Sequence, residues 1–273
     1  MKRSSRVRAA ATAAVSVLSL ALITGCGGSS NGGGGAEGAD SAGAAGSSAS
    51  GRPAGAAKAL GAAELKKLII APGDVAGYRV AAAKGGPSRS AVKADNDKCL
   101  PLLYVLSGLA PGDAAAETAR TATEKPKPSA AASTSVDDAS GQDVEDALTD
   151  SFSLTVTTVA LSSYDGDGAE KVMGSVSDAV AACAGGFTAT ADGEKQKFTE
   201  VSAEKPSGAG DASVAFAATG AMEDGDTAPL HGEVVRHGNT IASYYTINFG
   251  AMISKKAYDV PAAVLEAQSA KLK

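Results

Sequence analysis

The sequence predicts an α+β domain in which one antiparallel sheet is packed by a few helices. Two observations favour this class. In the last third of the chain, strand-like segments follow one another without helices between them, and helix-like segments lie before and after that run. A doubly wound parallel sheet would instead alternate strands and helices. We therefore expect a single extracytoplasmic domain over residues 59–273, a length that suffices for one well-packed core.

Residues 1–25 have the three zones of a secretory signal peptide. Cations at positions 2, 3, 6 and 8 precede an uncharged stretch, 9–22, that is rich in Ala, Val and Leu. This stretch is too short for a membrane-spanning helix, which needs roughly 20 apolar residues. It ends at Ile23-Thr24-Gly25-Cys26, which resembles the lipobox cut by the lipoprotein signal peptidase. The resemblance implies that Cys26 carries a lipid anchor; the alternatives are an ordinary signal peptide or an uncleaved anchor.

Residues 26–58 predict a flexible tether behind the lipidated cysteine. They consist almost wholly of Gly, Ala and Ser. Such a segment buries too little apolar surface to offset its conformational entropy. A tail without a function would have the same composition, but the position between anchor and domain favours a tether. We expect the protein to be lipid-anchored in the cell membrane, on its extracytoplasmic face.

The charge of the chain argues against nucleic acid as a partner. It has 25 Lys and Arg against 30 Asp and Glu. Without the four cations of the signal peptide the balance is 21 against 30, a net charge of −9. Phosphate backbones and anionic lipid surfaces would repel such a domain.

The cysteine count predicts one disulfide bond. Beside Cys26 the chain has only Cys99 and Cys183, an even pair in an exported protein. The alternatives are two buried free thiols or a catalytic thiol. A nucleophilic thiol would need a histidine base, and the sequence around neither cysteine contains one.

The first half of the domain shows two helices, one strand and a long polar segment. Apolar spacing predicts a helix over 60–70, and Pro101 suits the first turn of a second helix over 99–109. Residues 78–83 have the pattern of a strand. From about 113 to 146 the chain is rich in Ala, Ser, Thr and Pro, which predicts a mobile loop, either disordered or functional, with room for one weak strand.

A strand and a helix form the best-defined unit of the sequence. Residues 152–161 alternate apolar and polar side chains, with a change of phase near Thr157. After a turn, Asp167 is the expected N-cap of a helix that runs to Cys183. Its apolar residues recur every three or four positions and place Cys183 on the buried face.

Four strands and a terminal helix complete the domain. The strands are expected over 196–201, 212–218, 230–236 and 241–249. The tight connection between the last two predicts a hairpin. In the last strand, the face that carries Ile241 and Tyr245 is the expected core side. The helix should start near Asp259 and Pro261 and bury Val264, Leu265, Gln268 and Leu272.

No metal or cofactor is expected. His231, Glu233 and His237 share one face of a strand, but His237 lies roughly 13 Å along it from Glu233, too far for one ion. The acidic segment 165–168 is similar to part of a calcium loop but lacks the glutamate of the twelfth position. A helix cap explains that segment more simply.

The sequence also lacks a convincing catalytic motif. Ser90 and Lys93 have the Ser-x-x-Lys spacing of penicillin-recognising enzymes, yet no Lys-Thr-Gly triplet follows. A two-residue pattern of this kind is expected by chance in a chain of this composition. Gly-x-Ser-x-Gly elbows, phosphate loops and dinucleotide motifs are missing from the sequence. We therefore expect a protein that is not an enzyme.

The order of these elements resembles the extracellular sensor domain of mycobacterial serine/threonine kinase H and related actinobacterial lipoproteins. The features that carry the resemblance are an early helix with Leu65, Leu68 and Ile69; Cys99 with Pro101 and Leu102; and a unit of strand 156–161, Ser163-Tyr164 and the helix that ends at Cys183. The resemblance implies an α+β domain with a cleft for an extracellular ligand. This chain has a single cysteine pair in the domain and no kinase, so signalling is not implied.

Two functions remain open at this level. The first is a non-catalytic binding or sensor-like lipoprotein whose ligand is a small molecule, a lipid or an envelope polymer. The second is an accessory or structural envelope lipoprotein that acts through contact with another protein. An enclosed pocket would favour the first, and an exposed apolar patch the second.

Overall fold

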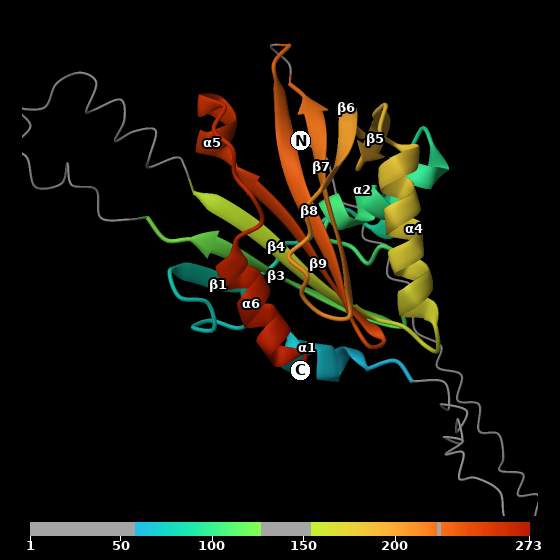
Figure 1. The fold of residues 1–273 in the computed structure, drawn as a ribbon, viewed down its shortest axis with the longest axis vertical. Helices are drawn as coiled ribbons and strands as arrows, with labels where there is room; N and C mark the ends of the chain where they lie inside the picture. Colours follow the sequence, from blue (N-terminus) through green and yellow to red (C-terminus); the bar gives the residue numbers. More distant parts are fainter. Residues whose placement is uncertain (1–57, 127–153, 223–224) are drawn as a thin grey trace, which may run out of the picture. The chain divides into compact units, whose positions relative to one another are not determined.

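The computed structural model describes residues 58–126, 154–222 and 225–273. These residues form a nine-stranded sheet in the order β1-β3-β4-β9-β8-β7-β6-β5-β2, and all neighbouring strands are antiparallel (Figure 1). The strands are β1 (Tyr78–Ala82), β2 (Lys93–Ala94), β3 (Ala116–Glu124), β4 (Thr155–Ser163), β5 (Phe187–Ala191), β6 (Glu194–Glu204), β7 (Ala212–Ala221), β8 (Thr227–His237) and β9 (Thr240–Asn248). The predicted α+β class with an antiparallel sheet is confirmed.

Helices pack on both faces of this sheet. The α-helices are α1 (Ala62–Leu68), α2 (Leu100–Leu106), α4 (Gly168–Ala182), α5 (Phe249–Ser254) and α6 (Ala262–Lys271), and the short 3₁₀ helices are η1 (Arg89–Ala91) and η2 (Asp97–Cys99). Figure 1 shows α2 and α4 together beside one part of the sheet and α1 with α6 beside another. Within the described ranges, none of the helices combines the length and apolar character needed to cross a membrane.

The strands from β5 to β9 form a meander, because each of them pairs with the next. The pairing of His237 with Thr240 confirms the predicted final hairpin, and Gly238 occupies its turn at a φ of 59°. Strand β4 lies beside β9 rather than β5. The chain therefore has to cross the sheet between β4 and β5, and α4 makes that crossing.

The face that carries α2 and α4 has its own hydrophobic core. The predicted buried side of α4 is confirmed, since Val172, Val176 and Val180 all pack inward. The disulfide between Cys99 and Cys183, predicted from the cysteine count, joins η2 to the C-terminal end of α4. Both cysteines are buried within this core. The bond therefore ties together two segments that are 84 residues apart.

The opposite face has a second core, in which α1 packs beside α6. Leu65 and Ile69 meet Val264 there, above Val159 and Tyr244 of the sheet. The fully buried Gln268 of α6 links the two helices. Its Oε1 accepts a hydrogen bond from the backbone N–H of Ile70 at 2.9 Å, and its Nε2 donates to the carbonyl of Leu68, also at 2.9 Å. This side chain therefore provides hydrogen-bond partners for one backbone carbonyl in the last residue of α1 and one backbone N–H just after the helix.

The central strands are covered on both sides, which corrects the expectation of a single core face for β9. Ile241 and Tyr245 pack toward α2 and α4, whereas Ala242 and Tyr244 pack toward α1 and α6. A sheet with helices on both faces buries consecutive side chains rather than alternate ones.

Two further expectations need correction. Residues 116–124, expected to open a mobile loop, form the inner strand β3 between β1 and β4. Backbone pairing on both edges holds this strand, although Ala122 is its only fully buried side chain. Strand β9 stops at Asn248, whose Oδ1 accepts from the N–H of Ala251 at 2.8 Å and starts α5. The signal peptide, Cys26, the tether as far as residue 57 and loop residues 127–146 lie outside the described residues.

Candidate ligand-binding pocket

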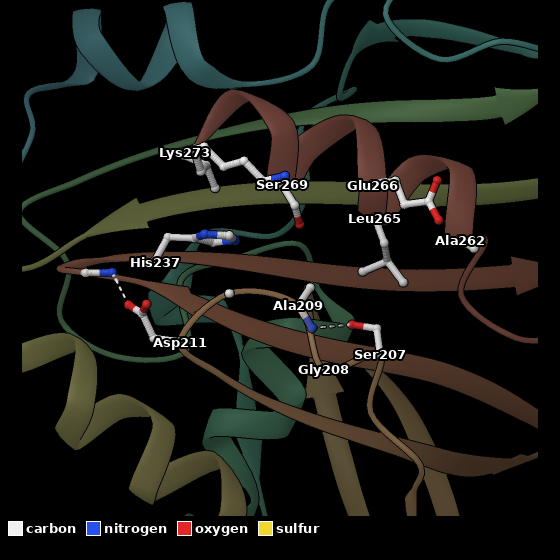
Figure 2. Close-up of a pocket in the computed structure, with 13 residues that line it drawn as sticks. Ser207, Gly208, Ala209, Asp211, His237, Ala262, Leu265, Glu266, Ser269 and Lys273 are labelled. Atoms are coloured by element: carbon white, nitrogen blue, oxygen red, sulfur yellow. Dashed lines mark hydrogen bonds between the residues drawn. The ribbon is translucent and has the colours of Figure 1, made fainter.

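A pocket of about 800 Å³ opens beside α6, on the face of the sheet opposite α4. Three segments build it: α6, the β6–β7 connection at 207–211, and the turn between β8 and β9 (Figure 2). The residues that line it are Ser207, Gly208, Ala209, Gly210, Asp211, His237, Gly238, Ala262, Leu265, Glu266, Ser269, Leu272 and Lys273. The lining combines apolar side chains with carboxylate, imidazole, hydroxyl and ammonium groups.

A buried carboxylate holds the β6–β7 connection in place. Glu233 on β8 is 4% exposed, and its Oε1 accepts from the backbone N–H of Ser207 at 2.9 Å and from the Ser207 hydroxyl at 2.5 Å. The same hydroxyl oxygen accepts from the N–H of Ala209 at 3.2 Å. Gly210 then passes so close to β8 that a Cβ atom there would lie 2.3 Å from the carbonyl oxygen of Arg236. The pocket wall is therefore fixed to the sheet.

Asp211 fixes the turn at the end of the pocket. Its Oδ2 accepts from the backbone N–H of Gly238 at 2.6 Å (Figure 2). The same oxygen lies 3.6 Å from the guanidinium Nη1 of Arg236. Burial lowers the pKa of the neighbouring His237 below its ordinary value of 6.5, and the cation of Lys273 lowers it further, whereas the Asp211 carboxylate opposes the shift. His237 therefore presents a neutral ring to the pocket at neutral pH.

One ring nitrogen of His237 is buried without a partner among the residues that the structure describes. This atom, Nε2, is shielded from water. A buried polar atom without a partner costs stability unless something binds it. A hydrogen-bonding group in the pocket reaches this atom only when the imidazole ring turns, because the atom is closed to solvent in this arrangement.

The depressed pKa of His237 leads to a prediction for NMR titration. The imidazole midpoint of His237 should lie below 6.5, and Asp211→Asn should lower it further because the opposing negative charge is lost. Since the folded state takes up this proton less readily than the unfolded chain, the contribution of neutral His237 to stability is present above pH 6.5. It is lost as the pH falls through the folded pKa.

The chain supplies a control for that titration. It contains only one other histidine, His231, whose partner is Glu204 rather than Asp211. The His231 resonances of the two proteins should therefore coincide. A His237 midpoint at or above 6.5, or one that rises in the Asp211→Asn protein, would contradict the assigned electrostatics.

Three polar side chains share one face of β8, as expected, but serve different purposes; they are His231, Glu233 and His237. His231 lies against Glu204, with its Nδ1 atom 3.0 Å from the carboxylate. Glu233 anchors Ser207, and His237 lines the pocket. The structure does not bring the three together around one ion.

Other motifs of the sequence lie away from the pocket. Ser90 is part of η1 while Lys93 begins β2, so the helical turn that the Ser-x-x-Lys pattern requires is not formed. Asp167 precedes α4 but makes no side-chain cap; its carboxylate pairs with Lys171 at 2.8 Å. Asp165 accepts from the N–H of Ala59 at 2.9 Å.

The residues of the pocket were missed by sequence reasoning, apart from His237. They come from three segments that are distant in the chain, and none of them forms a local motif. Only the alternation of His231, Glu233 and His237 along β8 indicated a polar strand face in this region.

Comparison with known proteins yields a likeness to solved structures and none to family models or curated proteins. Among solved structures, the chain is similar to the extracellular domain of PknH from Mycobacterium tuberculosis, with a TM-score of 0.46 and 12% sequence identity. The match covers 79% of this chain and 95% of that chain.

Proposed function

We propose that this protein is a membrane-anchored, extracytoplasmic lipoprotein with a non-catalytic, ligand-binding domain. The signal-peptide pattern that ends at Cys26 supports export and lipidation. The buried Cys99–Cys183 disulfide supports the same location, because such bonds persist in oxidising compartments outside the cytosol.

The observation that carries ligand binding is the pocket beside α6. Its volume of about 800 Å³ falls in the range of small-molecule sites, roughly 300–1,000 Å³. Leu265 and Leu272 offer apolar contact, while Asp211, Glu266 and Lys273 offer charged groups around the unpartnered Nε2 of His237. This lining fits a small amphipathic molecule that carries at least one hydrogen-bonding group.

Native mass spectrometry of the full chain, exported from an actinobacterial host, tests this function. The native mass should exceed the denatured mass by that of one co-purified ligand. The denatured spectrum should also show acyl chains on Cys26. Ala262→Phe fills the pocket from α6, so the ligand-bound fraction should fall at least about tenfold, equivalent to 1.4 kcal/mol of binding.

The adjacent Ala263→Phe is the matched control. Ala262 and Ala263 are both exposed in the first turn of α6, but only Ala262 lines the pocket. Ala263→Phe should keep the ligand. Equal native and denatured masses of the unaltered protein would argue against a small-molecule ligand, and equal losses in the two variants would argue against this pocket.

An accessory role through protein contact is the second candidate. Met222 and Phe249 are 44% and 54% exposed, unusually high for large apolar side chains. Met222 also borders a shallow pocket of about 620 Å³ that includes Leu230, Ile247 and Met252. Exposed apolar surface of this kind is typical of contact sites. A co-purified protein in place of a small molecule in the native spectrum would favour this role.

A further inference from the structure

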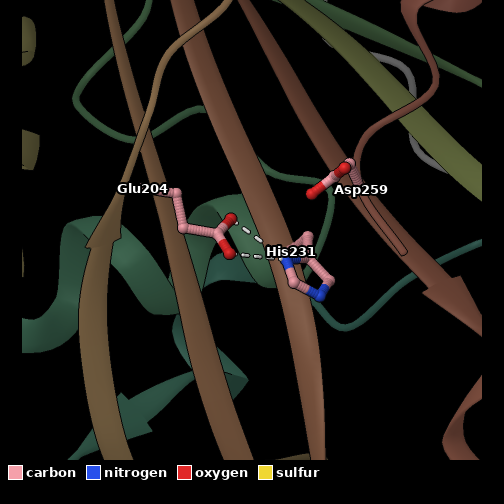
Figure 3. A group of neighbouring side chains, drawn as sticks. All are labelled: Glu204, His231 and Asp259. Atoms are coloured by element: carbon pink, nitrogen blue, oxygen red, sulfur yellow. Dashed lines mark hydrogen bonds and ion pairs between the residues drawn. The ribbon is translucent and has the colours of Figure 1, made fainter. Parts of the chain in front are cut away.

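We propose that Glu204, His231 and Asp259 bind a divalent transition-metal ion such as Zn²⁺, a site separate from the pocket beside α6. Glu204 ends β6, His231 lies in the middle of β8, and Asp259 belongs to the segment between α5 and α6. Figure 3 shows the two carboxylates on either side of the imidazole. Three segments distant in the sequence thus converge on one point.

The distances suit one small ion. The candidate ligand atoms of the three residues lie within 4.8 Å of one another, and Nδ1 of His231 is 3.0 Å from both carboxylate oxygens of Glu204. Around tetrahedral Zn²⁺, with bonds of about 2.0–2.1 Å, neighbouring ligand atoms are roughly 3.3 Å apart. The His231–Glu204 pair therefore needs to open by a few tenths of an ångström, and the exposed Asp259 side chain has the freedom to close on the ion.

The composition of β7 explains how Glu204 reaches His231 across the sheet. These residues lie on β6 and β8, with β7 between them, so their backbones are separated by roughly 10 Å. Register pairs His231 with Ala217 and Glu204 with Ala215, which places all four side chains on one face. The short alanine side chains leave room for the long Glu204 side chain to extend over β7.

Tyr258 holds both His231 and Asp259 in position. Its ring meets the His231 ring edge to face, with the centroids 4.5 Å apart. Its hydroxyl donates to the carbonyl of Pro229, two residues before His231 on β8. Asp259 is the next residue, so these contacts keep its backbone near His231 while its exposed side chain can still turn toward an ion.

The donor set determines the class of metal. One imidazole nitrogen and two carboxylates suit Zn²⁺ and similar ions, whereas Ca²⁺ and Mg²⁺ prefer oxygen ligands alone. Two ionised carboxylates balance the charge of a divalent ion. Binding requires the neutral imidazole with its proton on Nε2, so that the Nδ1 lone pair points at the ion. Three protein ligands leave a fourth position for water or a further ligand.

A Zn²⁺ titration of the full-length chain, followed by NMR of its two histidines, tests this site. One equivalent of Zn²⁺ should shift the His231 resonances and leave those of His237 in place. By calorimetry, Glu204→Gln and Asp259→Asn should each raise the Kd at least about tenfold, since even loss of an outer partner costs 10- to 100-fold. Both variants keep the shape of the side chain and remove its charge. The same concentration of Mg²⁺ should leave the His231 resonances unchanged.

The matched control is Glu200→Gln, an exposed carboxylate on the same strand as Glu204. The Kd of the Glu200→Gln protein for Zn²⁺ should stay within about twofold of the Kd of the unaltered protein. Loss of a metal ligand or of its outer partner would raise this Kd at least about tenfold. An unmoved His231 resonance, an equal response of His237, or equal losses in the Glu200 and Glu204 variants would each overturn the proposal. If Glu204→Gln lowers the folded fraction by circular dichroism, the exposed Asp259→Asn decides alone.

Discussion

Replacement of both domain cysteines, in the Cys99→Ala/Cys183→Ala protein, will lower the free energy of unfolding by on the order of 4 kcal/mol. The disulfide closes a chain segment of 84 residues, and its loss returns that conformational freedom to the unfolded state. For a domain of this size, the melting temperature should fall by roughly 10 °C. Urea denaturation and thermal circular dichroism of the full chain measure both quantities.

The reduced unaltered protein is the control for this variant. Treatment with a thiol reductant should bring its melting temperature down to that of the double variant, while the variant itself should not respond to reductant. The reason is that both proteins then lack the same covalent link between η2 and α4. A double variant as stable as the oxidised protein would contradict a stabilising role for the bond.

Substitution of Gln268 by leucine will lower the free energy of unfolding by about 2–6 kcal/mol. The residue is completely buried, and its amide group is the partner of the Ile70 N–H and the Leu68 carbonyl. Leucine fills a similar volume but leaves these two backbone groups without partners, each at a cost of about 1–3 kcal/mol. Chemical denaturation of the full chain provides the measurement.

The same substitution at an exposed glutamine is the matched control. Gln196 also donates to backbone carbonyls, those of Lys197 and Ala221, but it lies on the surface, where water can replace it. Gln196→Leu should therefore change stability by less than about 0.5 kcal/mol. If the two substitutions cost the same, the bridge between α1 and α6 contributes nothing beyond an ordinary surface contact.

The sequence predicted those helices and strands in which buried side chains recur at the period of the element. The apolar residues of α4 follow the helical period, so both the helix and the inward position of Cys183 could be inferred. The disulfide was predicted from the even cysteine count together with an N-terminal sequence that has the pattern of an export signal. In these cases a local periodicity or a covalent constraint is present in the sequence itself.

The sequence allowed one weak strand within the predicted loop but did not locate β3, because the side chains of β3 carry almost no burial signal. Its sequence is mostly Ala and Thr with charged residues between, and Ala122 is its only fully buried position. Hydrogen bonds to β1 and β4 determine its conformation, and those depend on partners elsewhere in the chain. Tertiary pairing of this kind overrides local propensity.

The pocket was unpredictable for a related reason. Asp211 and Leu265 lie close in space only because β8 carries the buried Glu233, which holds the β6–β7 connection, while Gln268 fixes α6 over the sheet. The candidate metal site likewise depends on two alanines of β7 that leave space between Glu204 and His231. The spacing of these residues in the sequence does not indicate that they lie close together in the folded protein.

The strand order affects how readily the sheets of two copies of this protein can pair with each other. An open sheet exposes unpaired N–H and C=O groups along its two outermost strands, and a long, flat edge invites pairing with another chain and aggregation. Here the outermost strands are β1, five residues long, and β2, only two residues long. Within the described residues, most of the hydrogen-bonding groups of the sheet are thus paired internally, which leaves short edges for pairing with a second copy.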